Sequence, residues 1–199
     1  MRIVEQLRLE WLDHYEGITP DNPITIYAAE DVMQDLNGIQ SKYGSFLSYY
    51  ERMGLITKKE IVEPIRINEV KITAVPVSEA VAVSIFVFES NGKKLIYAPC
   101  DCKPFPNAAL FCNADALIIG NTFIGDKLKN EKVLPPNSPL RQELHSFEDV
   151  LKLKAQFHIN HVVITHIEED WGKTYDEYCA LEKEYPGIRF AYDGLILDL

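Results

Sequence analysis

A series of short apolar segments in the second half of the chain constrains the fold more than any other feature. The dipeptide Asn91-Gly92 lies between two such segments and is typical of the tight turn of a β-hairpin. Two more apolar segments, 116–120 and 162–165, are separated by a helical pattern at 146–157. Strands that alternate with helices in this way indicate an α/β fold.

Other segments predict further elements by the same criteria. Ser146 is a good N-cap for the helix at 146–157, and Asp149 three residues later gives a pattern close to a capping box. The additional predictions are helices at 3–15, 29–36, 108–112 and 174–184, a short helix or lid near 46–50, strands at 24–28, 60–67, 70–77, 83–89 and 94–98, and a closing strand pair at 188–199. One α/β domain over residues 1–199 accounts for all of them.

Composition and charge narrow the classes of function. Apolar residues make up 47% of the chain, which is ordinary for a soluble protein. No stretch approaches the length of a membrane-spanning helix, and the N-terminus lacks a secretory pattern, so we expect a cytoplasmic protein without a membrane partner. The formal net charge of −10 disfavours sequence-independent binding to nucleic acid, but it leaves room for a local basic cleft or for small anionic substrates.

The chain has four cysteines, and their spacing does not match that of a structural zinc site. Cys100 and Cys102 are separated by one residue, whereas a zinc knuckle has two. Disulfides are not expected in a cytoplasmic chain of this length.

Side chains that can bind metal directly follow the buried strands. Cys100 and Asp101 come after 94–98, His166 comes after 162–165, and His145 precedes the helix at 146–157. Because the carboxyl ends of strands in α/β sheets meet at one edge, we expect these side chains to converge there. Each also has an ordinary explanation, as a hydrogen-bonded turn histidine, a helix-capping carboxylate or a solvated residue before a helix.

Together these segments resemble the metallo-β-lactamase fold, over roughly residues 24–199. Residues 70–79 resemble the family strand V-x-x-x-P-x-x-H, and residues 97–101 resemble the strand that delivers a metal-bridging aspartate. Thr165-His166 followed by Asp193-Gly194 resembles the end of the family's domain and is the most specific of these matches. The branch with the greatest similarity is that of the cyclic phosphodiesterases of phosphonate metabolism.

The resemblance implies a set of site residues. His166 matches a metal-ligand histidine, and Asp101 matches the bridging aspartate, with Cys100 as an alternative one residue away. Glu79 stands where the family usually has a ligand histidine, and His145 stands where the phosphodiesterase branch has a histidine that assists catalysis. The implied cofactor is a divalent metal ion, zinc or manganese; a carboxylate at position 79 lowers the preference for zinc, and three ligands predict partial occupancy.

The largest departure from the family is at the N-terminus, where its motif H-x-H-x-D-H belongs. Residues 9–17 retain Asp13 and His14 but have Leu9 and Trp11 in place of the leading histidines. Either this is a degenerate motif, or the chain begins after it. The second reading, which we favour, predicts an αββα sandwich that is incomplete at its N-terminus and comprises two-thirds or more of the family fold. A sheet without its neighbours exposes an apolar face, which predicts self-association as a homodimer.

The function implied by the resemblance is that of a metal-dependent hydrolase. A small-molecule phosphodiester or cyclic phosphate is the favoured substrate, and other esters remain open. Because the main metal-binding motif is missing, this chain alone is expected to have little activity. The alternative is a non-catalytic binding or scaffold domain of the same fold that has lost its metal site.

Overall fold

The computed structural model describes residues 23–78, 81–120 and 122–199. The chain divides into two compact units, the first ending at Glu63 and the second running from Pro64 to Leu199. The predicted helix over 3–15, with the candidate motif residues Asp13 and His14, lies outside the described residues, and so does Glu79. The expectation of one domain over residues 1–199 stays a prediction.

The first unit is a small α/β unit with its own core. Strand β1 (Ile24–Ala28) pairs in parallel with β4 (Ile56–Glu60), as strands joined by helical crossovers do. The remaining elements are α2 (Glu30–Gly38), α3 (Phe46–Arg52) and the hairpin of β2 (Gln40–Ser41) and β3 (Gly44–Ser45). The buried core residues are Ala28, Met33, Leu47, Leu55 and Ile56.

Most predictions in this first stretch of the chain are confirmed, but one strand has the wrong bounds. The strand at 24–28 and the helices near 29–36 and 46–50 are present. The single strand predicted at 60–67 is instead two, β4 and the short β5 (Ile65–Ile67). Pro64 lies between them and has no N–H to donate to a strand ladder, which explains the interruption.

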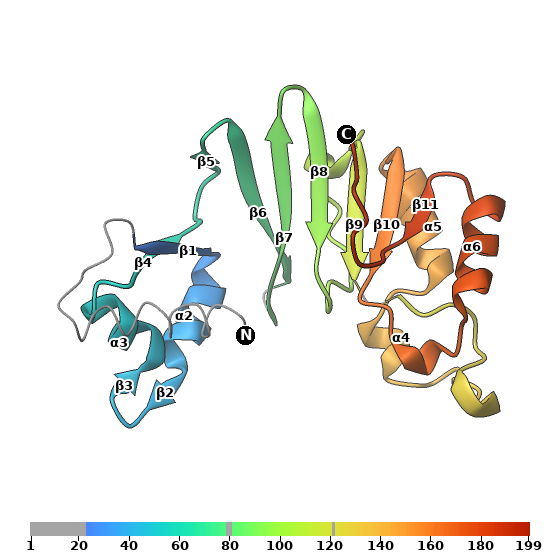
Figure 1. Ribbon diagram of the computed structural model, residues 1–199, viewed down its shortest axis with the longest axis horizontal. Coiled ribbons are helices and arrows are strands. Elements are labelled where there is room, and N and C mark those ends of the chain that lie inside the picture. Colours follow the sequence, from blue (N-terminus) through green and yellow to red (C-terminus); the bar gives the residue numbers. More distant parts are fainter. Residues whose placement is uncertain (1–22, 79–80, 121) are drawn as a thin grey trace. The chain divides into compact units, whose positions relative to one another are not determined.

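A seven-stranded sheet forms the second unit (Figure 1). Its strand order is β11-β10-β9-β8-β7-β6-β5, and the bounds of the strands not yet given are β6 (Val70–Ser78), β7 (Val81–Ser90), β8 (Lys93–Ala98), β9 (Ala116–Gly120), β10 (His161–Thr165) and β11 (Ile188–Phe190). Strands β5 to β8 are antiparallel neighbours, whereas β8 to β11 are parallel. The carboxyl ends of β8, β9 and β10 therefore lie at the same edge.

The turn between β7 and β8 is the one that the sequence predicts. Asn91 and Gly92 both have positive φ, 51° and 76°, and they form the two-residue loop between Ser90 and Lys93, which are paired. Two left-handed residues are what a tight hairpin turn requires, and Asn followed by Gly adopts this conformation at the lowest cost. This turn sets the register of the two strands.

Two capped helices flank the parallel half of the sheet. Helix α5 (Phe147–Gln156) begins with a complete capping box, in which the backbone N–H and side chain of Asp149 bond with Ser146 at 3.1 and 3.2 Å. Helix α6 (Tyr175–Glu184) has the same arrangement between Thr174 and Glu177. Both helices match the predictions. None of the helices in the described ranges is both long and apolar enough to span a bilayer.

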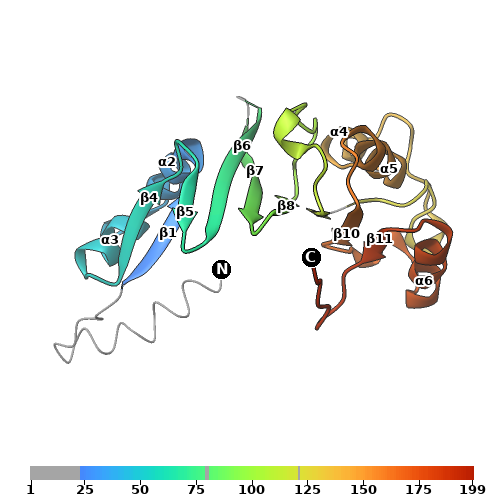
Figure 2. The ribbon, with the colours of Figure 1, turned by 90° about the horizontal axis from the view of Figure 1, so that it is seen from above.

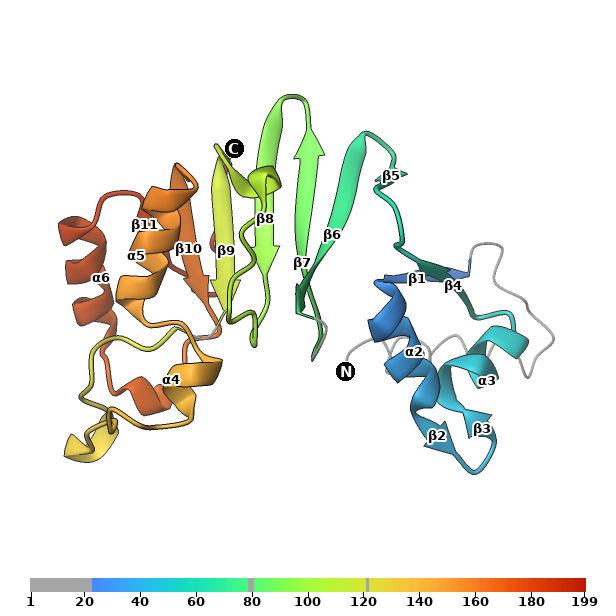
Figure 3. The ribbon, with the colours of Figure 1, turned by 180° about the vertical axis from the view of Figure 1, so that it is seen from behind.

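The main core lies between α5 and one face of the sheet, while the C-terminal segment runs along the other face (Figures 2 and 3). The covered face contributes alternate residues of each strand, as the pleat of a β-strand requires. The fully buried sheet residues of this core include Ile85, Val87, Ile96, Leu117, Ile119, Val162 and Ile164, and the facing residues of α5 and its C-cap are Phe147, Val150, Leu153 and Phe157. On the opposite face the alternation places Phe86, Phe88 and the exposed Tyr97.

Two predictions for the second unit need correction, and one element was not predicted. The closing strand pair over 188–199 is wrong, because only Ile188–Phe190 forms a strand and the turn at Gly194, with φ of 89°, takes the chain off the sheet edge. The short helix at 108–112 is a single 3-10 turn, Ala109–Phe111. The segment after β9, which has no predicted element, contains the short helix α4 (Leu140–Glu143).

Candidate functional site

The site is built at the carboxyl ends of three neighbouring parallel strands. Ala98 of β8 is paired with Ile119 of β9, and Thr165 of β10 is paired with Gly120. The residues that follow β8 and β10 therefore emerge on either side of the end of β9. This convergence is what the parallel register dictates, and it brings together segments that lie more than sixty residues apart in the sequence.

At this edge, a histidine lies between a cysteine and a glutamate and contacts both. Cys100 Sγ contacts His166 Nδ1, and His166 Nε2 lies 2.8 Å from Glu168 Oε1. When Nε2–H donates to the carboxylate, the lone pair of Nδ1 faces the sulfur. A carboxylate behind a histidine is the usual arrangement that fixes the ring orientation and tautomer of a metal ligand.

Gly120 makes room for this contact. A Cβ at position 120 would lie 3.2 Å from the backbone nitrogen of Cys100 and 3.3 Å from its Sγ. These distances are tighter than ordinary van der Waals contact, so any larger residue at the end of β9 would displace the cysteine. The glycine is therefore a positioning residue for the site.

Burial keeps both cysteines of the loop after β8 protonated at neutral pH. Desolvation raises the pKa of the Cys100 thiol, and the negative charge of Asp101 raises it further. Desolvation also raises the pKa of Cys102 to about 12. The Cys100 sulfur becomes a good ligand only as a thiolate, so a nearby cation is needed to favour that form.

His145 is buried, with 5% of its surface exposed, rather than solvated. Its Nε2 lies 3.3 Å from the carbonyl oxygen of Cys102, and its Nδ1 has no hydrogen-bond partner in the described residues. Because a carbonyl can only accept, Nε2 carries the proton and Nδ1 presents a lone pair. Desolvation, together with the positive charge of Lys103, lowers the pKa of His145, so the imidazole is neutral.

Lys103 fixes the position of the His145 segment relative to the loop after β8. Its Nζ bonds to the carbonyl oxygens of Arg141 and Leu144 at 2.8 and 3.1 Å and to the Asp149 carboxylate at 3.1 Å. One ammonium thus joins the end of α4, the start of α5 and the strand-end loop. These bonds use all three N–H donors of the Lys103 ammonium.

We expect the neutral state of His145 to appear in the pH dependence of stability. Because folding lowers the pKa of His145, the unfolded chain binds the proton more readily than the folded chain does. The stabilising contribution of neutral His145 is therefore fully present above pH of about 6.5, the ordinary pKa of histidine. It is lost as the pH falls through the lowered pKa of His145 in the folded state. In His145→Gln, whose amide nitrogen can still donate to Cys102, the loss of stability between pH 7.5 and 5 should be smaller than in the parent chain. Urea denaturation at both pH values measures this.

The exposed His161 gives the control, because His161→Gln removes a histidine that is not buried. It should leave the pH dependence of the free energy of unfolding unchanged. An equal change in the two variants would mean that burial of His145 does not produce the effect.

The predicted metal ligands remain predictions. The side chain of Asp101 is exposed, with φ of 60°, and makes no hydrogen bond or ion pair with His166. Within 23–78, 81–120 and 122–199, no cluster of three or more His, Cys, Asp or Glu side chains is arranged to hold a metal ion. Glu79 is not among these residues, so the set Asp101, His166 and Glu79 is not tested. Of the two alternatives after β8, Cys100 is the one in contact with His166.

Glu168 is the site residue that the sequence analysis did not single out. It follows His166 by two residues in a short extended segment, an interval that can place two side chains on the same side. The His-x-Glu interval was therefore a usable signal.

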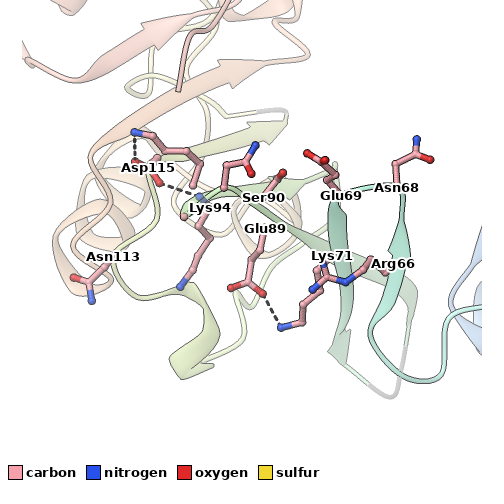
Figure 4. Close-up of a pocket in the computed structure, with 12 residues that line it drawn as sticks. Arg66, Asn68, Glu69, Lys71, Glu89, Ser90, Lys94, Asn113 and Asp115 are labelled. Carbon is pink, nitrogen blue, oxygen red and sulfur yellow. Dashed lines mark hydrogen bonds and ion pairs between the residues drawn. The ribbon is translucent and has the colours of Figure 1, made fainter.

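A wide opening of about 610 Å³ at the other end of the sheet is a poorer candidate (Figure 4). It lies at the start of β8, and its charged side chains are largely engaged with one another. Lys71 pairs with Glu89 at 2.8 Å, as a dashed line shows, and Lys93 pairs with Asp115 at 3.3 Å. Paired surface charges are common structural features, and they contribute little to the stability of a protein by themselves.

Comparison with known proteins identifies the fold. No family model and no curated protein sequence matches the chain. Among solved structures, it is similar to Zn²⁺-bound PqqB from Methylobacterium extorquens, with a TM-score of 0.63 and 20% identity, over 89% of this chain and 63% of that one. It is also similar to a diphosphatase from the PhnP family, with a TM-score of 0.58 and 17% identity, over 92% of this chain and 60% of that one.

A third similar structure is YhfI from Bacillus subtilis, described as a metallo-β-lactamase fold protein, with a TM-score of 0.57 and 10% identity, over 94% of this chain and 70% of that one. The chain therefore has the metallo-β-lactamase fold, and its mixed α/β class is confirmed. It spans 63% and 60% of the lengths of PqqB and the diphosphatase.

Proposed function

We propose that the chain supplies one side of the metal site of a metal-dependent hydrolase that acts on a phosphodiester or cyclic phosphate. The observation that carries this proposal is the contact of Cys100, His166 and Glu168 at the strand ends. The similarity to a zinc-bound protein and to a diphosphatase of the same fold supports it.

The donor types at the strand ends fit a divalent metal ion. A thiolate from Cys100 and a neutral imidazole from His166 are ligands that zinc prefers, and Glu168 occupies the place of the orienting carboxylate. A catalytic zinc usually has three protein ligands, so this pair is incomplete by itself. Asp101 and Glu79 are the candidates for the remaining positions. A divalent ion, when bound, supplies Lewis-acid polarisation of a phosphoryl oxygen.

The protein's own residues have distinct roles in this proposal. Glu168 holds the His166 ring with its Nδ1 lone pair toward the site. Hydrolysis adds water across one P–O bond of the diester, gives a monoester and an alcohol, and transfers a proton to the leaving oxygen. His145 is proposed as a group that accepts or returns a proton at Nδ1, the nitrogen that has no partner.

Metal analysis of site variants tests the proposal. We expect the purified chain to bind zinc in preference to manganese, at less than full occupancy, and Cys100→Ser and His166→Ala each to remove it. Glu168→Gln should weaken zinc affinity about 10- to 100-fold, because the imidazole loses its orienting carboxylate. Elemental analysis and zinc titration give the values, and hydrolysis of bis(p-nitrophenyl) phosphate should fall in parallel.

Cys112→Ser is the matched control, since Cys112 lies in the same part of the sequence but bonds through its carbonyl to Lys94. Its zinc content should equal that of the parent chain. If zinc binding is indifferent to Cys100 and His166, the hydrolase proposal is wrong and the binding-domain alternative takes its place. Full, chelator-resistant occupancy would instead mean that further ligands complete the site, with Asp13 and His14 the first to replace.

A further inference from the structure

A second cavity, of about 450 Å³, shares a wall with the candidate metal site. Glu168, which bonds to His166, also lines this cavity. The opposite walls come from the segment after β9, through Leu128, Leu140 and Leu144, and from Trp171. The volume lies within the range of about 300–1,000 Å³ that is usual for small-molecule sites.

The chemistry of the walls favours an uncharged apolar group. Leu144 and Trp171 belong to a buried cluster with Phe123 and Leu134, and Leu128 packs against it. The charged lining residues are two lysines and two carboxylates, which cancel one another: Lys129, Lys132, Glu168 and Asp170. Lys129 is further paired with Glu169. Because Glu169 engages Lys129, the lining has no excess of positive charge, and an apolar-walled cavity of this kind is poorly suited to holding a phosphate itself.

Trp171 contributes aromatic surface to this wall. Only 5% of this residue is exposed, and its indole Nε1, which has no hydrogen-bond partner in the described protein, is itself closed off from solvent. A ligand in the cavity would therefore meet other atoms of Trp171. A flat aromatic group would pack against such a surface.

Close backbone packing restrains the cavity at one point, where the residue after Trp171 meets Lys129. Gly172 has φ of 64°, and a Cβ there would lie 2.7 Å from the backbone nitrogen of Lys129 and 2.8 Å from its Cα. The two walls thus approach as closely as backbone atoms allow. A preformed pocket of this kind binds without a large ordering cost.

We propose that this cavity is the selectivity pocket of the site and that it binds the aryl group of an aryl phosphodiester, while the phosphate lies toward Glu168 and His166. The role of the pocket in hydrolysis rests on the proposed function, and the inference deepens that function by naming the substrate class. Small sugar-like or alkyl diesters lack the group that fills the cavity.

Binding of two diesters of equal charge tests the pocket directly. The chain has two tryptophans, so in a Trp11→Phe background the fluorescence of Trp171 reports on the cavity alone. Diphenyl phosphate should shift this fluorescence and bind at least tenfold more tightly than dimethyl phosphate. Equal binding of the two compounds, or no response of Trp171 to either, would overturn the inference.

A pair of wall variants locates the binding. Leu140 is 37% exposed at the start of α4, so Leu140→Asp adds a charge to the wall without burying it, at a helix position that tolerates aspartate. It should weaken diphenyl phosphate binding at least tenfold. Val133→Asp, at a residue of the same segment that is 68% exposed and does not line the cavity, should leave binding unchanged. Equal effects of the two variants would contradict the assignment.

One further variant separates this inference from the proposed function. His166→Ala should abolish zinc binding and diester hydrolysis, whereas the at least tenfold preference for binding diphenyl phosphate over dimethyl phosphate should remain. If no metal-dependent hydrolysis is found but the Trp171 response and its loss in Leu140→Asp remain, the pocket stands and the hydrolase proposal falls. If hydrolysis occurs but aryl and methyl diesters react equally, only the pocket is wrong.

Discussion

Replacing Gly172 with alanine is expected to lower the free energy of unfolding by about 2–4 kcal/mol. A left-handed φ of 64° costs a residue with a side chain about 1–2 kcal/mol, and the new Cβ would also meet backbone atoms of Lys129 at 2.7 and 2.8 Å. Backbone cannot move aside as a flexible side chain can, so the two segments must separate. The change should also enlarge or open the cavity beside Trp171.

Gly125 provides a matched control because it shares the conformation without the clash. Its φ is 69°, and no atom lies within 4 Å of a Cβ built there. Gly125→Ala should therefore cost only the conformational part, about 1–2 kcal/mol. Urea denaturation of both variants gives the difference, and equal losses would show that close packing at Gly172 contributes nothing.

Replacing Phe111 with alanine is the second change with a large expected effect, a loss of about 3–5 kcal/mol. The side chain is fully buried, and its ring packs against Phe105 and Phe157, with centroid distances of 5.1 and 5.6 Å. Truncation removes these contacts and leaves a cavity between the sheet and α5. Such a loss is comparable with the whole stability of a marginal domain.

The exposed Tyr192 serves as the comparison for Phe111, since it also carries a large aromatic ring. Tyr192→Ala should change the free energy of unfolding by no more than about 0.5 kcal/mol. Circular dichroism and denaturant titration distinguish the two cases. Similar losses in both variants would mean that the core around Phe111 is not packed as described.

The parts of the fold that could be predicted are those whose causes are local. The turn at Asn91-Gly92 is set by two residues that accept left-handed φ, and α5 is set by the Ser146–Asp149 cap. The segment between β9 and α5 could not be predicted in this way. Its course depends on Lys103, which reaches from another loop to the carbonyl groups of Arg141 and Leu144. Contacts of that kind have no signature in the segment's own sequence.

The candidate site shows the same division. The rule that polar side chains at strand ends converge selected the segments that contain Cys100 and His166, because it needs only the strand order. Which of Cys100 and Asp101 contacts His166 could not be predicted from the sequence, because it depends on the backbone direction of one residue. The positive φ of Asp101, 60°, accompanies an exposed carboxylate, while the preceding sulfur contacts the histidine.

The short strands at the two sides of the large sheet have a consequence for solubility. Strands β5 and β11 are each three residues long, whereas β7 has ten. On the β5 side, the stretch of β6 that extends past its neighbour contains Pro76, which lacks an N–H, and a register shift follows at Pro76–Ser78. A second chain that tried to add a strand at either side would find few regularly spaced hydrogen-bonding groups. Within the described part of this unit, aggregation by strand addition is therefore disfavoured.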